Sequence, residues 1–166
     1  MTDINQENKN NNSKVPLKTY HSAFLLALGI LIIDQNIKYL FVSGYRFETE
    51  CISGVLTYNK GVAFSMFAFL GEYLKYIQIT VLFGVIGFIA FSEDGKKLIL
   101  PAGLLLGAGF SNILDRFTYG GVVDYVYWHC YFDFAIFNFA DVIIDLGVAI
   151  MLYITFRESR KKSKSS

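Results

Sequence analysis

Two aspartates, Asp124 and Asp141, lie in strongly apolar segments, GGVVDYV and FNFAD. If they face one another, both cannot ionise readily, because like charges at close range raise the pKa of one carboxyl. Such a pair can activate water with one carboxylate while the other acid protonates a carbonyl oxygen. Alternatively, Asp141 caps the start of a helix and Asp124 is a solvated loop acid. The spacing alone leaves both interpretations open.

Other ionisable residues lie within apolar stretches, where such groups usually pair with each other or face a cavity. Asp34 and Lys38 are four residues apart, which favours a neutralising ion pair on a helix. Asp115 beside Arg116 is consistent with an interface pair, although a guanidinium at this level can also hold a lipid phosphate. Asp145 lies one turn below Asp141 on the same face; packing or hydrogen bonding within the helices would account for it, and nothing in the sequence marks it as catalytic.

The elements that position these residues are predicted to be membrane helices. The chain has 166 residues, of which 54% are hydrophobic and 17% charged, more apolar than an ordinary soluble domain. A spanning helix needs roughly 20 predominantly apolar residues. Four stretches meet this requirement: His21–Phe41, Tyr73–Phe91, Leu98–Phe117 and Phe137–Phe156. The first continues into DQNIKYLFV without a small-residue cleavage pattern, so we interpret it as a retained anchor.

The basic residues predict the orientation of these spans. Ten of the 15 lysines and arginines lie before the first span, between the second and third, or after the fourth. That side is expected to be cytoplasmic. Both termini are then inside, and two loops, at about 42–72 and 118–136, lie outside. The polar residues of four distant segments consequently converge near the outer ends of the spans.

These observations predict an all-α membrane protein, a four-transmembrane-helix bundle with a small extracytoplasmic β-sheet domain. Residues 1–20 are expected to form a disordered cytoplasmic tail, 21–156 the transmembrane domain and 157–166 a basic cytoplasmic tail. Partial alternation in FETECISGVLTYN favours a sheet within the 42–72 loop. The aromatic 118–136 loop is expected to lie at the level of the lipid headgroups.

The two cysteines, Cys51 and Cys130, fall on the predicted outer side. They could pair in an oxidising compartment, but two separate thiols fit the sequence equally well. No CxxC motif or other metal-ligand spacing is present, so we expect no metal. No organic cofactor is expected either.

Five motifs in order resemble those of the lipoprotein signal peptidases, the type II signal peptidases of bacteria. They are DQNIK (34–38), YNKGVAFS (58–65), GAGFSNILDR (107–116), GVVDY (121–125) and FNFAD (137–141). The resemblance covers about residues 20–156. In GAGFSN, Ala108 and Ser111 replace glycines of the family's pattern, and both are small enough to preserve close packing.

The resemblance implies an intramembrane aspartic endopeptidase that removes signal peptides from diacylglyceryl-modified prolipoproteins, just before the lipidated cysteine. It implies Asp124 and Asp141 as the catalytic pair. Residues that bind substrate or support the site would be Asn59, Asn112, Arg116, Asn138, Asp34 and Lys38.

The implied location is the bacterial inner membrane, with the active site near the outer face. The expected partners are the lipid-modified prolipoprotein and membrane lipids, with no nucleic acid, and the chain is expected to be a monomer. A proton-conducting transporter is disfavoured because span two and the inner halves of the other spans lack polar residues. An inactive assembly protein would leave the convergence of polar residues unexplained.

Overall fold

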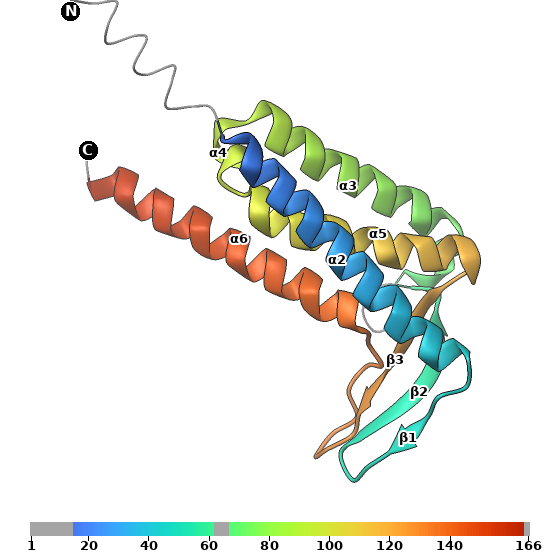
Figure 1. The fold of residues 1–166 in the computed structure, drawn as a ribbon. Helices are drawn as coiled ribbons and strands as arrows, with labels where there is room; N and C mark the ends of the chain where they lie inside the picture. Colours follow the sequence, from blue (N-terminus) through green and yellow to red (C-terminus); the bar gives the residue numbers. More distant parts are fainter. Residues whose placement is uncertain (1–14, 62–66, 165–166) are drawn as a thin grey trace, which may run out of the picture.

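Four long helices run side by side, and a small sheet lies at one end of them (Figure 1). The computed structural model describes residues 15–61 and 67–164. The long helices are α2 (Leu17–Val42), α3 (Tyr73–Phe91), α5 (Ile99–Thr118) and α6 (Phe139–Lys164). The short helices are η2 (Ala68–Leu70) and α4 (Glu93–Lys96), and the strands are β1 (Phe47–Glu48), β2 (Ile52–Asn59) and β3 (Val122–Trp128).

Three helices of the described residues, α2, α3 and α6, are long and apolar enough to cross a membrane. Their outer surfaces carry many exposed apolar side chains, which fits lipid as the surrounding medium. The fourth long helix, α5, packs against all three of them and has the most buried residues. The expected mostly helical chain with a small sheet is therefore confirmed, and three of the four predicted spans are helices that meet the length and composition of a membrane span.

The helix bounds agree with the sequence prediction most closely in the middle of the chain. Helix α3 has the predicted bounds, and α5 is displaced by one residue at each end. Helix α2 begins at Leu17 rather than His21, directly after Pro16, so residues 17–20 were wrongly assigned to the tail. Proline is well suited to a helix start because it has no amide hydrogen to leave unpaired.

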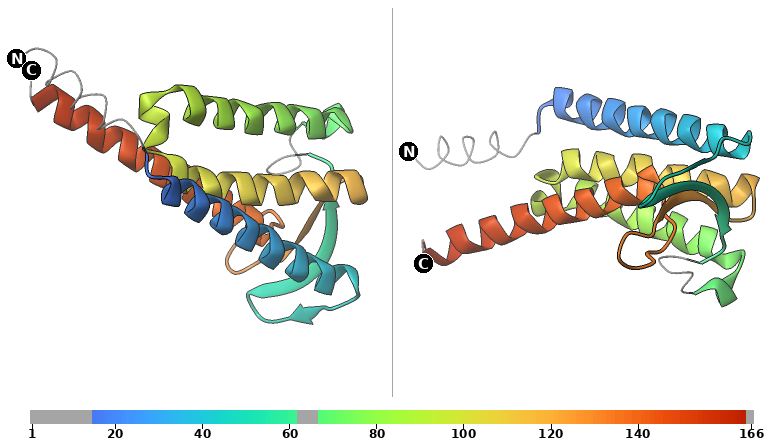
Figure 2. Two further views of the ribbon diagram at one scale, coloured as in Figure 1. Left: turned by 45° about the horizontal axis from the view of Figure 1, so that its top comes forward. Right: turned by 90° about the horizontal axis from the view of Figure 1, so that it is seen from below.

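Helix α6 continues eight residues beyond the predicted end at Phe156, to Lys164. This continuation carries Glu158, which lies 3.5 Å from Lys161 and 3.7 Å from Lys97. Lys162 lies 3.7 Å from Asp94 of α4. The start of α2 and the end of α6 both lie at the end of the bundle opposite the sheet (Figure 2).

Helices α2 and α5 approach each other closely along a stripe of small residues. A Cβ atom added to Gly107 would lie 2.7 Å from the Cα of Ala27, and one added to Gly103 would lie 2.7 Å from the carbonyl oxygen of Ala23. Both distances are below ordinary van der Waals contact. Glycine therefore permits the two backbones to touch, as is common where membrane helices pack.

The sheet is antiparallel with the order β1-β2-β3. Strand β3 was not predicted, although its VVDYVYW sequence is rich in the β-branched and aromatic residues that favour strands. It brings part of the 118–136 loop into the sheet by pairing with β2. A disulfide joins Cys51 to Cys130, which settles the alternatives for these cysteines in favour of the pair.

Candidate active site

Asp124 lies in β3 rather than in a solvated loop, which was one of the two interpretations left open by the sequence. Its side chain is 2% exposed and its two oxygens accept separate hydrogen bonds. Asn59 Nδ2, on the neighbouring strand β2, donates to Asp124 Oδ2 at 2.9 Å. Asn138 Nδ2 donates to Asp124 Oδ1 at 2.7 Å. Pairing of β2 with β3 places Asn59 beside this carboxyl.

Asp141 lies in the first turn of α6, as its sequence position predicted. Asn112 Nδ2 of α5 donates to Asp141 Oδ1 at 2.9 Å. The backbone amide of Asn138 donates to Asp141 Oδ2 at 3.1 Å, while the amide of Asp141 donates to Asn138 Oδ1 at 2.9 Å. This reciprocal pair is a capping arrangement at the helix start.

Asn138 therefore hydrogen-bonds to both aspartates: its side-chain NH2 group donates to Asp124, and its side-chain oxygen accepts from the backbone amide of Asp141. Burial raises the pKa of Asp124 to about 7, and the negative charge of Asp141 contributes to the rise. Hydrogen bonds from Asn59 and Asn138, together with the charge of Lys38, act in the opposite direction. A carboxyl with such a pKa can hold a proton near neutral pH and release it.

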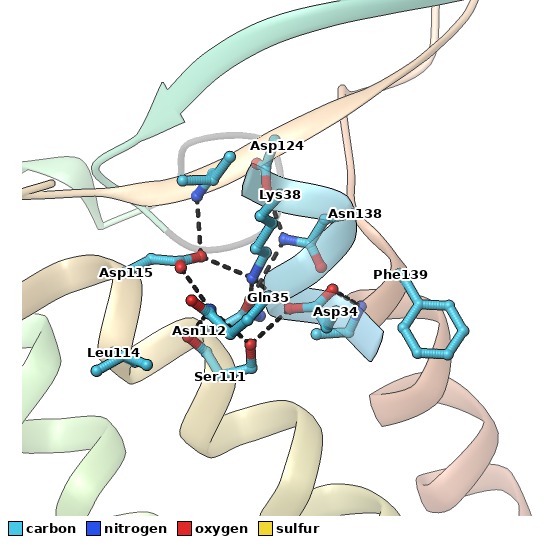
Figure 3. Close-up of polar contacts among 12 residues, drawn as sticks. Asp34, Gln35, Lys38, Ser111, Asn112, Leu114, Asp115, Asp124, Asn138 and Phe139 are labelled. Atoms are coloured by element: carbon cyan, nitrogen blue, oxygen red, sulfur yellow. Dashed lines mark hydrogen bonds and ion pairs between the residues drawn. The ribbon is translucent and has the colours of Figure 1, made fainter. Parts of the chain in front are cut away.

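A buried ionic cluster centred on Lys38 lies below Asp124 in the view of Figure 3. Lys38 Nζ lies 2.6 Å from Asp34 Oδ2 and 2.6 Å from Asp115 Oδ2. It also donates to Asn112 Oδ1 at 2.7 Å. The predicted pairing of Asp34 with Lys38 is confirmed, and each of these side chains is at most 2% exposed.

The predicted pairing of Asp115 with Arg116 is not what the structure shows. Asp115 turns toward α2 and pairs with Lys38, whereas Arg116 donates a hydrogen bond to the carbonyl oxygen of Gly61. The two side chains are adjacent in sequence, and neighbouring positions on a helix point in different directions. Arg116 remains close enough to Asp124, Asp115 and Asp141 to interact with their charges.

Asp145 is exposed on α6. Residues 62–65 of the YNKGVAFS motif lie outside the described residues. Within the described ranges, no group of three or more His, Cys, Asp or Glu side chains is placed to hold a metal ion.

Four buried or partly buried residues with evident roles in this arrangement were not predicted as site residues: Gln35, Ser111, Asp115 and Tyr125. Gln35 Nε2 donates to Ser111 Oγ and to Asp115 Oδ1, both at 2.8 Å, and Ser111 Oγ donates to Asp34 Oδ2 at 2.6 Å. Helical spacing could have identified two of them, because Ser111 and Asp115 are four residues apart and share a face of α5.

Two solved structures share this fold, and both are described as bacterial membrane enzymes solved by the in meso method. The first, at 2.3 Å resolution, has a TM-score of 0.75 and 25% sequence identity, covering 88% of this chain and 93% of the other. The second, at 1.9 Å resolution, has a TM-score of 0.69 and 26% identity, covering 82% of this chain and 92% of the other. The fold is thus one that bacterial membrane enzymes adopt.

Sequence comparison gives the particular family. The family described as Signal peptidase (SPase) II matches residues 26–157. The lipoprotein signal peptidase of Sulfurimonas denitrificans is 58% identical over 141 residues, which cover 85% of this chain and 92% of that protein. That of Wolinella succinogenes is 55% identical over 139 residues, 81% of this chain and 95% of that protein. The chain therefore belongs to the signal peptidase II family, whose members are proteases that process lipoproteins.

Proposed function

We propose that this chain is an aspartic endopeptidase in which Asp124 and Asp141 form the catalytic dyad. Its substrate would be a prolipoprotein that carries diacylglycerol on a cysteine, cleaved just before that cysteine. The observation that carries the proposal is the position of Asn138, which hydrogen-bonds to Asp124 and also caps the helix turn that holds Asp141. A buried carboxyl, that of Asp124, and a partly buried one, that of Asp141, are thereby linked through one asparagine although they come from separate elements.

The dyad can hydrolyse a peptide bond without a cofactor. Asp141, ionised, removes a proton from water while the water oxygen bonds to the carbonyl carbon. Asp124, protonated, gives its proton to the carbonyl oxygen, producing a neutral tetrahedral intermediate. Breaking of the carbon–nitrogen bond then returns a hydroxyl proton to the now ionised Asp124, and Asp141 protonates the departing amine. Both carboxyls regain their starting states, and the products are a carboxylic acid and an amine.

The side chains around the dyad have separate supporting roles in this proposal. Asn59, Asn112 and Asn138 donate hydrogen bonds that orient the two carboxyls. Arg116 ties the end of α5 to the segment after β2 through Gly61. Asp34 and Lys38 support the site through their own ion pair and through the ion pair of Lys38 with Asp115 of α5.

The membrane arrangement follows from the same hypothesis. We propose that α5 is a fourth span, since its 20 residues would extend about 30 Å and its polar residues face the other helices. The four spans would form a monomeric transmembrane bundle in the bacterial inner membrane, with both termini cytoplasmic. The sheet and the dyad would then lie near the outer face, where the lipidated cysteine of a membrane-anchored substrate is available. The Cys51–Cys130 disulfide supports this side as the oxidising one.

A direct test compares two peptides with the sequence of a prolipoprotein cleavage region, one with a diacylglyceryl group on the cysteine and one without. The purified chain is expected to cleave the lipidated peptide at the bond before the cysteine and to leave the other essentially intact. Mass spectrometry of the products identifies the bond. Failure to cleave the lipidated peptide, or equal cleavage of both peptides, would contradict the proposed substrate class.

The pKa of Asp124 predicts how activity depends on pH. Its folded-state pKa, about 7, is above the ordinary value of 3.8, so the acid is protonated below about pH 7 and loses its proton above it. Activity of a dyad that needs one proton should therefore fall as pH rises through this range. The kcat/KM for the lipidated peptide, measured from pH 5 to 9, checks this expectation. The same shift makes the contribution of Asp124 to folding stability largest below pH 3.8 and lost as pH rises through about 7.

A further inference from the structure

The Lys38 cluster is connected to the backbone on both sides of the proposed dyad. Asp115 Oδ2 accepts a hydrogen bond from the amide of Val123 at 3.1 Å, and Val123 is the residue before Asp124. Asp34 Oδ1 accepts a hydrogen bond from the amide of Ala140 at 3.0 Å, and Ala140 is the residue before Asp141. The two carboxylates that hold these amides are the same two that Lys38 bridges.

From this connection we infer that Lys38 is a positioning residue that sets the separation and orientation of Asp124 and Asp141 through Asp34 and Asp115. The inference rests on the proposed function of the dyad. Among the described residues, Lys38 makes its hydrogen bond and ion pairs with Asn112, Asp34 and Asp115 and none with the two aspartates of the dyad, so its effect passes through those three side chains. Each carboxylate connects Lys38 to the backbone immediately before one member of the dyad.

Burial makes this cluster sensitive to the loss of any one member. Lys38, Asp34 and Asp115 carry a net formal charge of −1, and each is at most 2% exposed. Removing the ammonium would leave two buried carboxylates without their shared cation. Buried charges that lose a partner are costly and rearrange or protonate. Either change would shift Val123 and Ala140, and with them the two aspartates. Displacement by about 1 Å at a reacting group can reduce a rate about 100-fold.

Other contacts also restrain the backbone of β3 and of the start of α6. The contribution of Lys38 to positioning is what remains beyond these contacts. Phe137 pairs with Val126 of β3, and the amide of Phe139 donates to Tyr125 Oη at 3.0 Å. These contacts attach the start of α6 directly to the sheet. Lys38 instead attaches both segments to α2 and α5, so its loss should disturb catalytic geometry while the sheet and helices remain assembled.

Lys38 also contributes its charge to the site, which gives a second measurable effect. Asp124 is influenced by Asp141 of α6, which raises its pKa, and by Lys38 of α2, which lowers it. Arg116 of α5 also interacts with the charge of Asp124, and the remaining charged groups of the cluster are Asp34 and Asp115. Without Lys38 the dyad should retain its proton to higher pH. The fall in activity on the alkaline side of the pH profile should therefore occur at a higher pH.

The test compares Lys38→Met with Lys97→Met in the purified full chain. Lys97 makes a suitable control because it also lies near two carboxylates, Asp94 at 3.0 Å and Glu158 at 3.7 Å, but at the far end of the bundle. Kinetics on the lipidated peptide should show that Lys38→Met lowers kcat by about 100-fold or more and changes KM by less than about threefold, the pattern of lost transition-state stabilisation. The alkaline limb of its pH profile should lie at a higher pH than that of the unmodified protein. Lys97→Met should match the unmodified protein both in its kinetic constants and in its pH profile.

A second variant, Lys38→Met with Asp115→Asn, keeps the net buried charge of the cluster at −1. It is expected to fold, to show the same loss of kcat, and to show the same shift of the alkaline limb to higher pH. Retention of normal kcat by either folded variant, or a rise in KM alone, would overturn the inference. An unmoved alkaline limb would do so as well. Failure of both variants to fold would also overturn it, because Lys38 would then hold the bundle together rather than position the dyad.

These outcomes are distinct from a failure of the proposed function. If the dyad is assigned wrongly, asparagine substitutions of Asp124 and Asp141 leave cleavage intact. If only the inference about Lys38 is wrong, those substitutions abolish cleavage while the Lys38 variants remain active.

Discussion

Replacing either Asp124 or Asp141 with asparagine is expected to reduce kcat for the lipidated peptide by about 10²–10⁴-fold, the range typical of a lost general acid or base. Asparagine retains the size of aspartate but can neither carry the shared proton nor remove one from water. Each single substitution should therefore have nearly the full effect, because the two carboxyls act as a unit. Initial rates measured under single-turnover and steady-state conditions check this expectation.

Each substitution also affects hydrogen bonding, so folding must be measured alongside activity. Both oxygens of Asp124 accept from amide donors, Asn59 Nδ2 and Asn138 Nδ2. An asparagine at this position places its own NH2 group against one of these donors. Such an unmatched buried pair costs about 1–3 kcal/mol. Thermal unfolding in detergent separates this loss of stability from the loss of catalysis.

Asp145→Asn is the matched control for the two dyad substitutions. Asp145 lies one turn along α6 from Asp141 but is exposed, so we expect activity to remain substantial. Near-normal cleavage by folded Asp124→Asn or Asp141→Asn would refute the dyad. Loss of activity in Asp145→Asn to the same extent would show that the assay responds to any charge removed from this helix.

Substitution of Gly107 is expected to have the second largest effect. Gly107→Leu places a bulky side chain where even a Cβ atom would lie 2.7 Å from the Cα of Ala27. Helices α2 and α5 must then separate, at a cost of about 1–3 kcal/mol or more. The same stripe of α5 carries Ser111 and Asp115 at helical spacing, so separation would also pull Asp115 away from Lys38. Both the unfolding temperature and kcat should fall.

Gly29→Ala is the control for this substitution. Gly29 lies on α2, and a Cβ atom added there meets nothing within 4 Å. Alanine at this position should leave activity unchanged and be neutral or slightly stabilising, because glycine inside a helix costs roughly 0.5–1 kcal/mol relative to alanine. If Gly107→Leu unfolds at the same temperature as Gly29→Ala, the close approach of α2 and α5 is not important for stability.

The sequence predicted the long helices well because each is marked by a continuous apolar stretch. It predicted the Asp34–Lys38 pair for a similar reason, since both residues lie on one helix at a spacing with a known contact. The bounds were less accurate where no apolar signal exists: α6 continues through charged residues to Lys164, and ion pairs rather than hydrophobicity mark that segment.

Contacts between distant elements were beyond prediction from one sequence. Asp115 was considered as an ion-pair partner of its neighbour Arg116. No sequence pattern indicated that Lys38 faces Asp115 where α2 packs against α5. Strand β3 was missed because its pairing with β2 joins two segments that are separated in sequence by two long helices, α3 and α5, and two short ones. For Asp124 the sequence left two interpretations open, one member of an acid pair or a solvated loop acid, because spacing alone could not place it in a strand.

The Cys51–Cys130 bond has a consequence for biogenesis. Helices α3 and α5 lie between the two cysteines, so the bond cannot form until both helices have been synthesised. Thiols persist in the reducing cytosol and pair in oxidising compartments, so under the topology proposed above closure would also report that both segments have crossed the bilayer. A nascent chain inserted with one hairpin inverted would keep its two thiols on opposite sides of the membrane. With that topology, the covalent bond would mark correctly inserted chains and distinguish them from misinserted ones.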